Sequence, residues 1–448
     1  MNMKKADLEK IRQKFPALKF VRDGRIPVYF DNACSVLKPQ CVIDSVSKWM
    51  TENGGCGGGR SSHILAAETD ELCESARQYV AEFAGYAPEE TVFTANTTDS
   101  VNMIAAAFPF RPDRNEAVIF AGSHHSLMLP FLEQQESGRC RIRVAGINSP
   151  LELPEDEILR LISKKTAIVA VPMASNITGK AFDIQKIIRR AHECGAFVLA
   201  DAAAYLPCHI PSWKNLDSGD FLNKNTEKTL ILDEIQPKNA KNDSKNAEKP
   251  DFLAFSGHKI GSLPIGALIC RRELFKMLVP TTAGGGTVAS VSAGDFGISA
   301  DYLTGIRRYE AGIQNYPGII SFGEAAKFIM SIGREKISEH TAYLSEMLRQ
   351  ELCKMPEIGI AGDNGTECRS SITSIYFKDR DISAQDFGIF LSGQPEYAIC
   401  TRIGRHCAMP ALDLPGIGDT VRVSLYAYNT EEEISVFLGI LNKFLYGI

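Results

Sequence analysis

The sequence predicts an α/β fold in which helices cover a mostly parallel central sheet, followed by a smaller α+β C-terminal domain. Three observations predict it. The chain has 448 residues, which is enough to bury one large core and a second, smaller one. From about residue 28 to residue 300, short β-branched runs alternate with longer helical patterns, as in a parallel sheet. After about residue 315 this alternation gives way to helices and one alternating run.

The elements follow in chain order. Residues 1–15 read as a charged amphipathic helix. The predicted strands of the large domain are runs rich in β-branched or other apolar residues, at 92–94, 117–120, 167–171 and 197–200. A helix is predicted from residue 98 and another over 184–194, whereas a loop with histidines follows the second strand. The smaller domain is predicted to contain helices at 320–332, 337–354 and 431–445 and an alternating run at 371–377.

We therefore divide the chain into an N-terminal segment, 1–28, that packs on the small domain, a large domain, 29–315, and a small domain, 316–448. The alternation stops between residues 213 and 250, where 238–249 is rich in Lys, Asn, Asp and Ala without an apolar period. We interpret 213–250 as an inserted surface loop, with a short strand at 229–232.

Composition excludes several classes of function. The net charge of −5 and the pI near 6.0 give no electrostatic reason to expect nucleic acid or an anionic membrane as a partner. The longest apolar runs are too short to span a bilayer, and the N-terminus lacks the apolar core of a signal peptide. Twelve scattered cysteines without zinc-site spacing indicate reduced thiols, so we expect a cytoplasmic protein without a metal site.

Lys259 is the first candidate for chemistry. It ends the tetrapeptide Ser256-Gly257-His258-Lys259, which follows an apolar run and precedes a turn that contains glycine. Burial and a neighbouring cation lower the pKa of such an amine, and the neutral amine can bond covalently to an aldehyde cofactor. Because most lysines near a strand end are merely solvated, the interpretation depends on partner residues elsewhere in the chain.

Those partners occur in the order that a pyridoxal-phosphate site requires. Asp201 follows a predicted strand, where a carboxylate can pair with a pyridinium nitrogen, although a helix N-cap is the ordinary alternative. Thr97 and Thr98 lie between a strand and a helix, so their hydroxyls and the helix dipole suit a phosphate. Ser256 and His258 can add donors to the same phosphate.

Two further residues are candidates for contact with the cofactor ring. His124, in the pair that follows the second predicted strand, can stack on the ring face and shuttle a proton. Asn176 can hydrogen-bond the ring hydroxyl. The ordinary alternatives are a solvated loop histidine and a turn asparagine.

The motifs together resemble the cysteine desulfurase and selenocysteine lyase family, whose members are class V aminotransferase-like enzymes of PLP-dependent transferase fold type I. The resemblance covers about residue 29 to the C-terminus, interrupted by the insertion, and its C-terminal part resembles the group II, selenocysteine-lyase-like branch. It is carried by Asp201, Ser256–Lys259, Tyr309–Gly312, Arg402–Pro410, Arg422–Tyr426 and Tyr428–Thr430.

The resemblance implies a role for each matching residue. Lys259 would hold pyridoxal 5′-phosphate and then transfer protons, while Arg422, with Arg402 nearby, would bind the substrate carboxylate. Cys407 would attack the sulfur of L-cysteine, or the selenium of L-selenocysteine, leaving alanine and, with cysteine, a persulfide for an acceptor protein or small thiol. Because the attack needs a thiolate, we expect His406 and nearby arginines to form a cationic neighbourhood around Cys407. The resemblance alone implies a homodimer.

The chain also departs from the family pattern, and these departures keep other functions open. Ala204 stands where relatives often carry a glutamine, and the sequence of 201–204, Asp-Ala-Ala-Ala, is closer to the molybdenum-cofactor sulfurase-like branch. Ile313 stands where relatives carry a threonine that reaches the phosphate bound by the partner subunit. The segment 57–63 differs as well. The alternatives are another class V reaction, such as transamination, racemisation or β-elimination, or a catalytically silent homologue.

Overall fold

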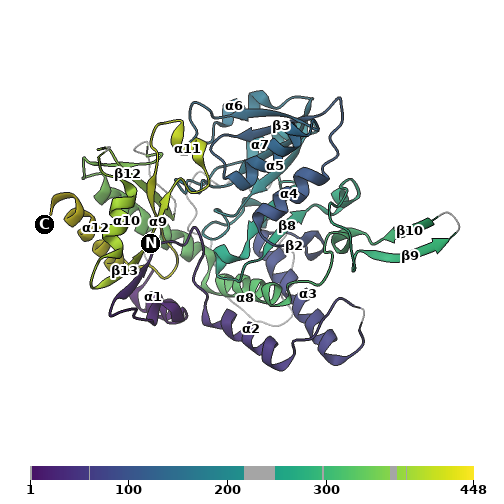
Figure 1. Cartoon of the computed structure of the whole chain (residues 1–448), viewed down its shortest axis with the longest axis horizontal. Helices are drawn as coiled ribbons and strands as arrows, with labels where there is room; N and C mark the ends of the chain where they lie inside the picture. Colours follow the sequence, from purple (N-terminus) through teal and green to yellow (C-terminus); the bar gives the residue numbers. More distant parts are fainter. Residues whose placement is uncertain are drawn as a thin grey trace.

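The computed structural model describes residues 3–59, 61–215, 248–294, 297–363, 371–379 and 381–447. Its elements form two groups, a large sheet with its helices and a smaller α+β group that also holds both ends of the chain (Figure 1). The long helix α8 (Tyr316–Ile332) runs from the large group toward the small one.

The large group is built on a sheet of seven described strands, of which β8 alone runs antiparallel to its neighbours. The predicted mostly parallel sheet is therefore confirmed. The strands lie in the order β2 (Thr91–Thr94), β8 (Gly266–Cys270), β7 (Phe252–Ser256), β6 (Phe197–Asp201), β5 (Thr166–Pro172), β3 (Glu116–Phe120) and β4 (Arg141–Ala145).

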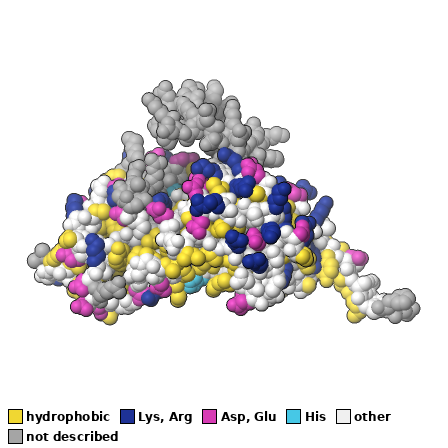
Figure 2. Space-filling view, turned by 90° about the horizontal axis from the view of Figure 1, so that it is seen from above, with side chains coloured by type: hydrophobic (Ala, Val, Ile, Leu, Met, Phe, Trp, Pro, Cys, Tyr) yellow, Lys and Arg dark blue, Asp and Glu magenta, His cyan; other side chains and the backbone are white. Residues whose placement is uncertain are grey.

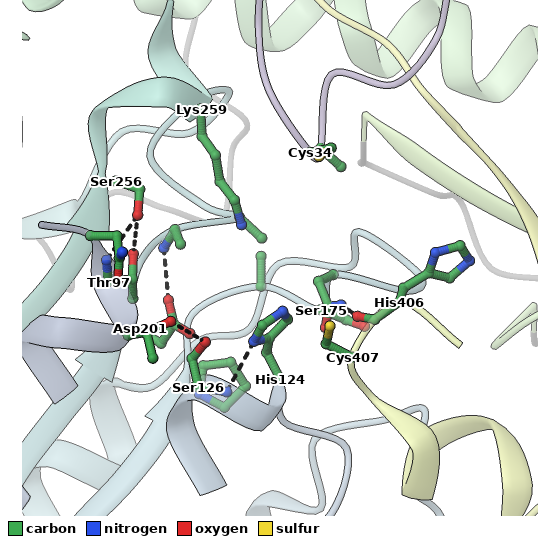
Figure 3. A pocket seen from close by; sticks show the side chains of 18 of the residues that line it. Cys34, Thr97, His124, Ser126, Ser175, Asp201, Ser256, Lys259, His406 and Cys407 are labelled. Carbon is green, nitrogen blue, oxygen red and sulfur yellow. Dashed lines mark hydrogen bonds between the residues drawn. The ribbon is translucent and has the colours of Figure 1, made fainter. Parts of the chain in front are cut away.

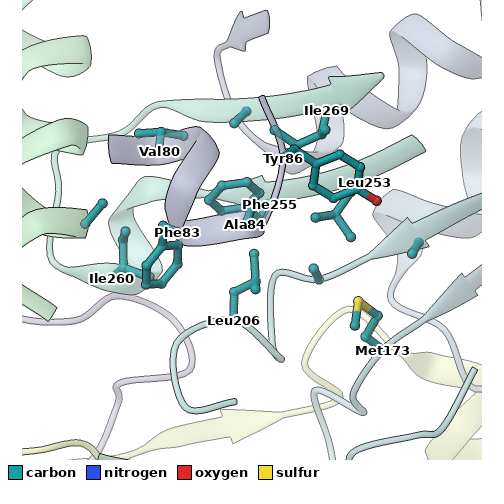
Figure 4. Close-up of a cluster of buried hydrophobic side chains, with 14 of the residues drawn as sticks. Val80, Phe83, Ala84, Tyr86, Met173, Leu206, Leu253, Phe255, Ile260 and Ile269 are labelled. Atoms are coloured by element: carbon teal, nitrogen blue, oxygen red, sulfur yellow. The ribbon is translucent and has the colours of Figure 1, made fainter. Parts of the chain in front are cut away.

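Helices bury both faces of this sheet, as the alternating residues of β5 show. Val169 and Val171 belong to one apolar cluster, whereas Ile168 and Ala170 belong to another on the opposite face. Figure 4 shows part of the first cluster, in which Phe83 of a helix packs near Phe255 of β7. The helices around the sheet are α2 (Gln40–Glu52), α3 (Ile64–Ala84), α4 (Thr97–Ala107), α5 (His125–Glu136), α6 (Glu155–Leu161) and α7 (Gln185–Glu193).

The small group is an antiparallel sheet covered by helices. Its strands lie in the order β11 (Ile358–Ile360), β12 (Ile372–Phe377), β15 (Thr420–Ser424) and β14 (Arg402–Gly404). An apolar cluster of its own fills the space between the sheet and the helices α9 (Arg334–Leu352), α10 (Ala384–Ser392) and α12 (Glu431–Tyr446). The short helix α11 (Met409–Asp413) stands between this group and the large sheet.

The N-terminal segment lies against the small group. Its helix α1 (Lys5–Gln13) carries Arg12, whose Nη1 lies 2.8 Å from Oε1 of Glu433. Its strand β1 (Ile26–Tyr29) pairs in parallel with β13 (Tyr397–Cys400). These contacts agree with a segment packed on the small domain, but the three domain boundaries remain a prediction.

Two local features differ from the sequence-based expectations. The helix α5 begins at His125, where a loop was expected, because the side chain of His124 caps its N-terminus. The hairpin of β9 (Val288–Gly294) and β10 (Gly297–Tyr302), which projects from the large group in Figure 1, was not predicted. Apolar and polar residues alternate at 298–302, but the hairpin is exposed on both faces, so no buried apolar run marks its strands. The predicted strand at 229–232 lies outside the described residues.

Short 3₁₀ helices complete the chain: η1 (Pro16–Lys19), η2 (Pro88–Glu90), η3 (Ser212–Asn215), η5 (Gly257–Ile260), η6 (Arg272–Lys276) and η7 (Gly305–Arg308). Figure 2 shows basic and acidic side chains mixed over the viewed face, with apolar side chains collected along its lower part. Among the described helices, none combines the length and apolar character that a membrane crossing needs. The described part of the chain also holds no cluster of metal-ligating side chains.

Candidate active site

A cavity of about 330 Å³ lies at the carboxyl ends of the parallel strands, where the small group meets the large sheet (Figure 3). The large group contributes the residues that follow its strands, and the small group contributes β14, β15 and the segment after β14. All eleven side chains predicted for the site line this cavity: Thr97, Thr98, His124, Asn176, Asp201, Ser256, His258, Lys259, Arg402, Cys407 and Arg422.

Lys259 and Asp201 are two ionisable groups of the cavity whose pKa values depend on burial and on each other. Lys259 follows β7 on η5 and points into the opening in Figure 3, while Asp201 is the last residue of β6 and accepts a hydrogen bond from the N–H of Ala203 at 2.9 Å. Burial lowers the pKa of the Lys259 amine, and the Asp201 carboxylate partly opposes this effect. Burial likewise raises the pKa of Asp201, with Lys259 acting in the opposite direction. The site therefore makes the neutral amine more accessible than in water.

The N-terminus of α4 forms one wall of the cavity. Thr97 is its first residue, and both the N–H and the hydroxyl of Thr97 contact Oγ of Ser256, at 2.9 and 2.6 Å. Thr98 Oγ1 lies 2.7 Å from Oγ of Ser126. The N-cap itself is Asn96, which accepts from the N–H of Asp99, so neither threonine is needed as the cap. The hydroxyls and the helix dipole together suit an anion.

His124 lies in the cavity as a neutral ring. Its Nδ1 accepts a hydrogen bond from the N–H of Ser126 at 3.1 Å, so the proton of the neutral ring is on Nε2. Burial, followed by the charge of Lys259, lowers the pKa of His124 to about 3. His258 also lines the cavity, and burial lowers its pKa to about 4. At neutral pH both rings can donate hydrogen bonds but carry no charge.

Asn176 connects the two groups of elements. Its side-chain Nδ2 donates to the carbonyl oxygen of His406 at 2.8 Å, and its main-chain carbonyl oxygen accepts from Nη1 of Arg422 at 3.0 Å. It therefore fixes both the segment before Cys407 and a predicted substrate-binding guanidinium.

The two arginines of the small group lie near one carboxylate. Arg402 binds Asp31 through Nε–Oδ1 at 3.2 Å and Nη2–Oδ2 at 2.8 Å, and Nη2 of Arg422 lies 3.8 Å from Oδ1 of Asp31. Arg422 is buried on β15, and its Nε has no hydrogen-bond partner among the described residues. Burial lowers the pKa of Arg422 to about 10. An unpartnered donor of a buried cation facing a cavity suits an anionic group of a ligand.

Cys407 follows β14 in a segment with unusual backbone geometry. His406 and Cys407 have φ of 50° and 55°, a left-handed region that costs non-glycine residues of order 1–3 kcal/mol each. The carbonyl oxygen of Cys407 accepts from the N–H of His125 at 2.7 Å, so contacts with the large group maintain this conformation. The thiol is exposed at the cavity (Figure 3).

The expected cationic neighbourhood of Cys407 differs in the structure. Burial lowers the pKa of His406 to about 3, so this ring is neutral. Arg405 instead pairs with Asp413 and Asp419, at 2.7 and 2.6 Å. Arg402 donates to Sγ of Cys34 at 2.6 Å. Of the residues expected to be positively charged beside Cys407, His406 is therefore neutral, and Arg405 and Arg402 bind other groups.

Sequence reasoning missed Asp31, Cys34 and Ser126. Asp31 and Cys34 belong to the segment that follows β1, and a short polar stretch after a strand was the available signal. Of the two single-residue departures from the family pattern, Ala204 lines the cavity, whereas Ile313 is 78% exposed and lies outside the cavity lining.

Comparisons with known proteins agree with this geometry. A family model described as aminotransferase class V matches residues 28–231 and 222–437. A probable cysteine desulfurase of Streptomyces coelicolor is 33% identical over 442 residues, covering 96% of each chain. A cysteine desulfurase of an Enterobacter species is 29% identical, covering 95% of each.

A solved structure agrees as well. The crystal structure of a cysteine desulfurase from Escherichia coli superposes with a TM-score of 0.80 at 25% identity, covering 98% of each chain. Class V aminotransferases and cysteine desulfurases in general depend on pyridoxal phosphate. The chain thus belongs to the class V aminotransferase family, among its cysteine desulfurases.

Proposed function

We propose that this protein is a pyridoxal-phosphate-dependent cysteine desulfurase that converts L-cysteine to L-alanine and holds the removed sulfur as a persulfide on Cys407. One observation carries the proposal: a single cavity joins the amine of Lys259, the exposed thiol of Cys407 and the buried guanidinium of Arg422, whose Nε has no hydrogen-bond partner among the described residues. An amine, a thiol and an anion-binding cation are the groups that this reaction needs.

The residues of the cavity fit the cofactor. Lys259 offers a buried amine whose pKa is lowered, as covalent attachment to an aldehyde requires. Asp201 offers a carboxylate for a ring nitrogen, and Thr97 with Ser256 offers hydroxyls at a helix N-terminus for a phosphate. Once bound, pyridoxal phosphate supplies an electron sink that withdraws electrons from the substrate's Cα.

The substrate would be held by the arginines. Arg422 would donate to the carboxylate of L-cysteine, with Arg402 nearby, and Asp31 and Asn176 would orient the two guanidinium groups. Burial of Arg422 strengthens its attraction for an anion because solvent screening is weak there.

Lys259 and Cys407 would then act on different atoms of the substrate, Lys259 on Cα and Cys407 on the sulfur. As a neutral amine, Lys259 accepts the proton from Cα and later returns a proton, while His124, neutral with its proton on Nε2, donates a hydrogen bond. The Cys407 thiolate attacks the substrate sulfur, so that an S–S bond forms and the substrate's C–S bond breaks. The electron pair of the broken bond takes a proton, which gives alanine.

The exposure of Cys407 supports transfer of the persulfide sulfur to an outside acceptor protein or small thiol. Selenocysteine, which differs only in the attacked atom, remains an alternative substrate. From family membership alone, we also infer that the enzyme is a cytoplasmic homodimer.

Two measurements test the proposal. Adding pyridoxal phosphate should colour the protein, and borohydride should then fix the cofactor on the Lys259 peptide, with Lys259→Ala as the control. L-Cysteine, compared with L-selenocysteine, should yield alanine and sulfide with a thiol reductant present. Cys407→Ala should abolish sulfur release, whereas Cys353→Ala, an exposed thiol outside the cavity, should not.

A colourless protein with an unlabelled Lys259 peptide would remove the cofactor from the proposal. Colour with full sulfur release in Cys407→Ala would instead indicate another class V reaction. Colour without any turnover of cysteine would indicate a catalytically silent homologue.

A further inference from the structure

Among the described residues, two thiols line the active-site cavity. Cys407 is the persulfide residue of the proposed function, and Cys34 enters from the segment that follows β1 (Figure 3). The charges of Lys259 and Arg422 each interact with both Cys34 and Cys407, which places the two thiols within charge-interaction range of the same two cations. Neither thiol forms a disulfide.

Cys34 is held in position by its own segment and by the small group. Its N–H donates to the carbonyl oxygen of Asp31 at 3.1 Å, and the N–H of Ala33 donates to Oγ of Ser424 on β15 at 2.9 Å. Its sulfur accepts a hydrogen bond from Nη2 of Arg402. A guanidinium donor stabilises negative charge on a sulfur better than a neutral donor does. Among the described residues, no comparable cation contact is recorded for the Cys407 sulfur.

The backbone conformation and the exposure of the segment that carries Cys407 bear on whether its sulfur can reach Cys34. Because His406 and Cys407 both have left-handed backbone conformations, their present arrangement stores strain. Hydrogen bonds from His125 and Asn176 hold the backbone of the Cys407 segment, whereas Cys407 itself is exposed at the cavity. Transfer between the two sulfurs therefore needs a movement of this segment toward Cys34.

We propose that Cys34 is a second sulfur carrier, which takes the outer sulfur of the Cys407 persulfide and frees Cys407 for another turnover; this inference rests on the proposed function. The Cys34 sulfur attacks that outer sulfur, so an S–S bond forms on Cys34 while the S–S bond on Cys407 breaks. One proton passes from Cys34 to Cys407. One persulfide and one thiol exist before and after the step, so no oxidant or reductant is consumed.

The first experiment counts alanine and locates sulfur in the holoenzyme, loaded with pyridoxal phosphate and mixed with L-cysteine without acceptor or reductant. Wild type should form about two alanines per chain, because two thiols store sulfur, and both the Cys34 and Cys407 peptides should gain one sulfur by mass spectrometry. Cys34→Ser keeps a hydroxyl that can accept from Arg402, yet it should form only about one alanine per chain. The matched control Cys353→Ala should behave as wild type.

The order of transfer is tested with Cys407→Ala. Its Cys34 peptide should gain no sulfur from L-cysteine, because Cys34 is proposed to receive sulfur only through Cys407. Sulfur on Cys34 in this variant would overturn the relay, and so would about two alanines per chain in Cys34→Ser. If wild type forms no alanine at all, the proposed function fails; if alanine forms and only Cys407 is labelled, the relay alone fails.

A second measurement needs no turnover. Dibromobimane, which alkylates two neighbouring thiols and becomes fluorescent when both have reacted, is added to the cofactor-free protein. A bridged Cys34–Cys407 peptide pair should form in wild type and in Cys353→Ala, but in neither Cys34→Ser nor Cys407→Ala. Absence of the bridged pair from wild type would contradict the approach of the two sulfurs.

Discussion

Asp31 controls where both predicted substrate-binding guanidinium groups lie. Its carboxylate forms a two-point contact with Arg402, and its Oδ1 lies 3.8 Å from Nη2 of Arg422. The side chain of Asp31 is only 15% exposed, so solvent screens these contacts weakly. An aspartate that does not touch the substrate itself can therefore determine how well the substrate is held.

Asp31→Asn tests this role at the residue scale. The amide cannot accept from both donors of Arg402 with full charge, and hydrogen bonds to charged groups contribute about 1.5–3 kcal/mol. The KM for L-cysteine should therefore rise about tenfold to a hundredfold, with a smaller change in kcat. Steady-state alanine formation measures both constants. Glu155→Gln, which alters a pair with Lys186 far from the cavity, is the control, and an unchanged KM in Asp31→Asn would contradict the role.

At the scale of elements, a buried ion pair joins α3 to the segment after η7. Nη1 and Nη2 of Arg77 donate to the two carboxylate oxygens of Glu310 at 2.8 and 2.9 Å. Glu310 also accepts from the N–H of Phe93 on β2 at 2.7 Å. The two charged side chains are 6% and 8% exposed, so neither can exchange its partner for water.

Glu310→Gln should lower the free energy of unfolding by about 3–5 kcal/mol, because it leaves the buried Arg77 charge with only the exposed carboxylate of Glu74, 3.6 Å from its Nε, as a counter-ion. Urea unfolding measures the loss. Glu273→Gln, at the exposed pair with Arg271, should cost about 1 kcal/mol or less and provides the control. A loss of equal size in both variants would show that burial does not determine how much the Arg77–Glu310 pair contributes to the free energy of unfolding.

A second contact between elements lies at the C-terminal end of the inserted segment and is sensitive to pH. His192 of α7 lies 2.6 Å from Glu248 through Nδ1 and 3.0 Å from Asp251 through Nε2, and Asp251 also binds Arg271. The hydrogen bond to Asp251 raises the pKa of His192 above its ordinary value of 6.5, against the opposing effect of burial. Protonated His192 thus stabilises the folded state.

The stability that His192 contributes should be fully present below the unfolded pKa of 6.5 and should be lost as pH rises through the higher folded value. The difference in unfolding free energy between wild type and His192→Gln is therefore largest in mildly acidic buffer and shrinks toward alkaline pH. Urea unfolding across this range measures it. A difference that stays constant, or that grows with pH, would exclude a charged His192 in the folded protein.

At the scale of the whole molecule, the sequence predicted what depends on local pattern. Strand runs and helical periods identified the parallel sheet, and the positions after strands identified Lys259 and Asp201, because strand ends of one sheet converge. It could not predict the contact between Asp31 and Arg402, which are 371 residues apart in sequence. Nor could it predict that Arg405 would pair with two aspartates instead of charging the Cys407 site, since folding decides which opposite charges meet.

Because residues far apart in sequence form the cavity together, we can predict how the cofactor affects the stability of the protein. The cavity draws its walls from both the large and the small group, so pyridoxal phosphate should stabilise the contact between them. At a cofactor concentration a hundred times its dissociation constant, binding adds about 2.7 kcal/mol to the stability of the folded state. Hydrogen exchange should therefore slow after cofactor is added in the segments around Cys34, Thr97 and Cys407, although they belong to different elements.

The exposed hairpin of β9 and β10 contributes nothing to the cavity lining and should exchange at the same rate with and without cofactor, which makes it an internal control. Protection confined to the large group would mean that the cofactor leaves the small group free to move. Protection that includes Cys34 and Cys407 would mean that the cofactor holds both thiols in one closed cavity, where the chemistry of each depends on the other.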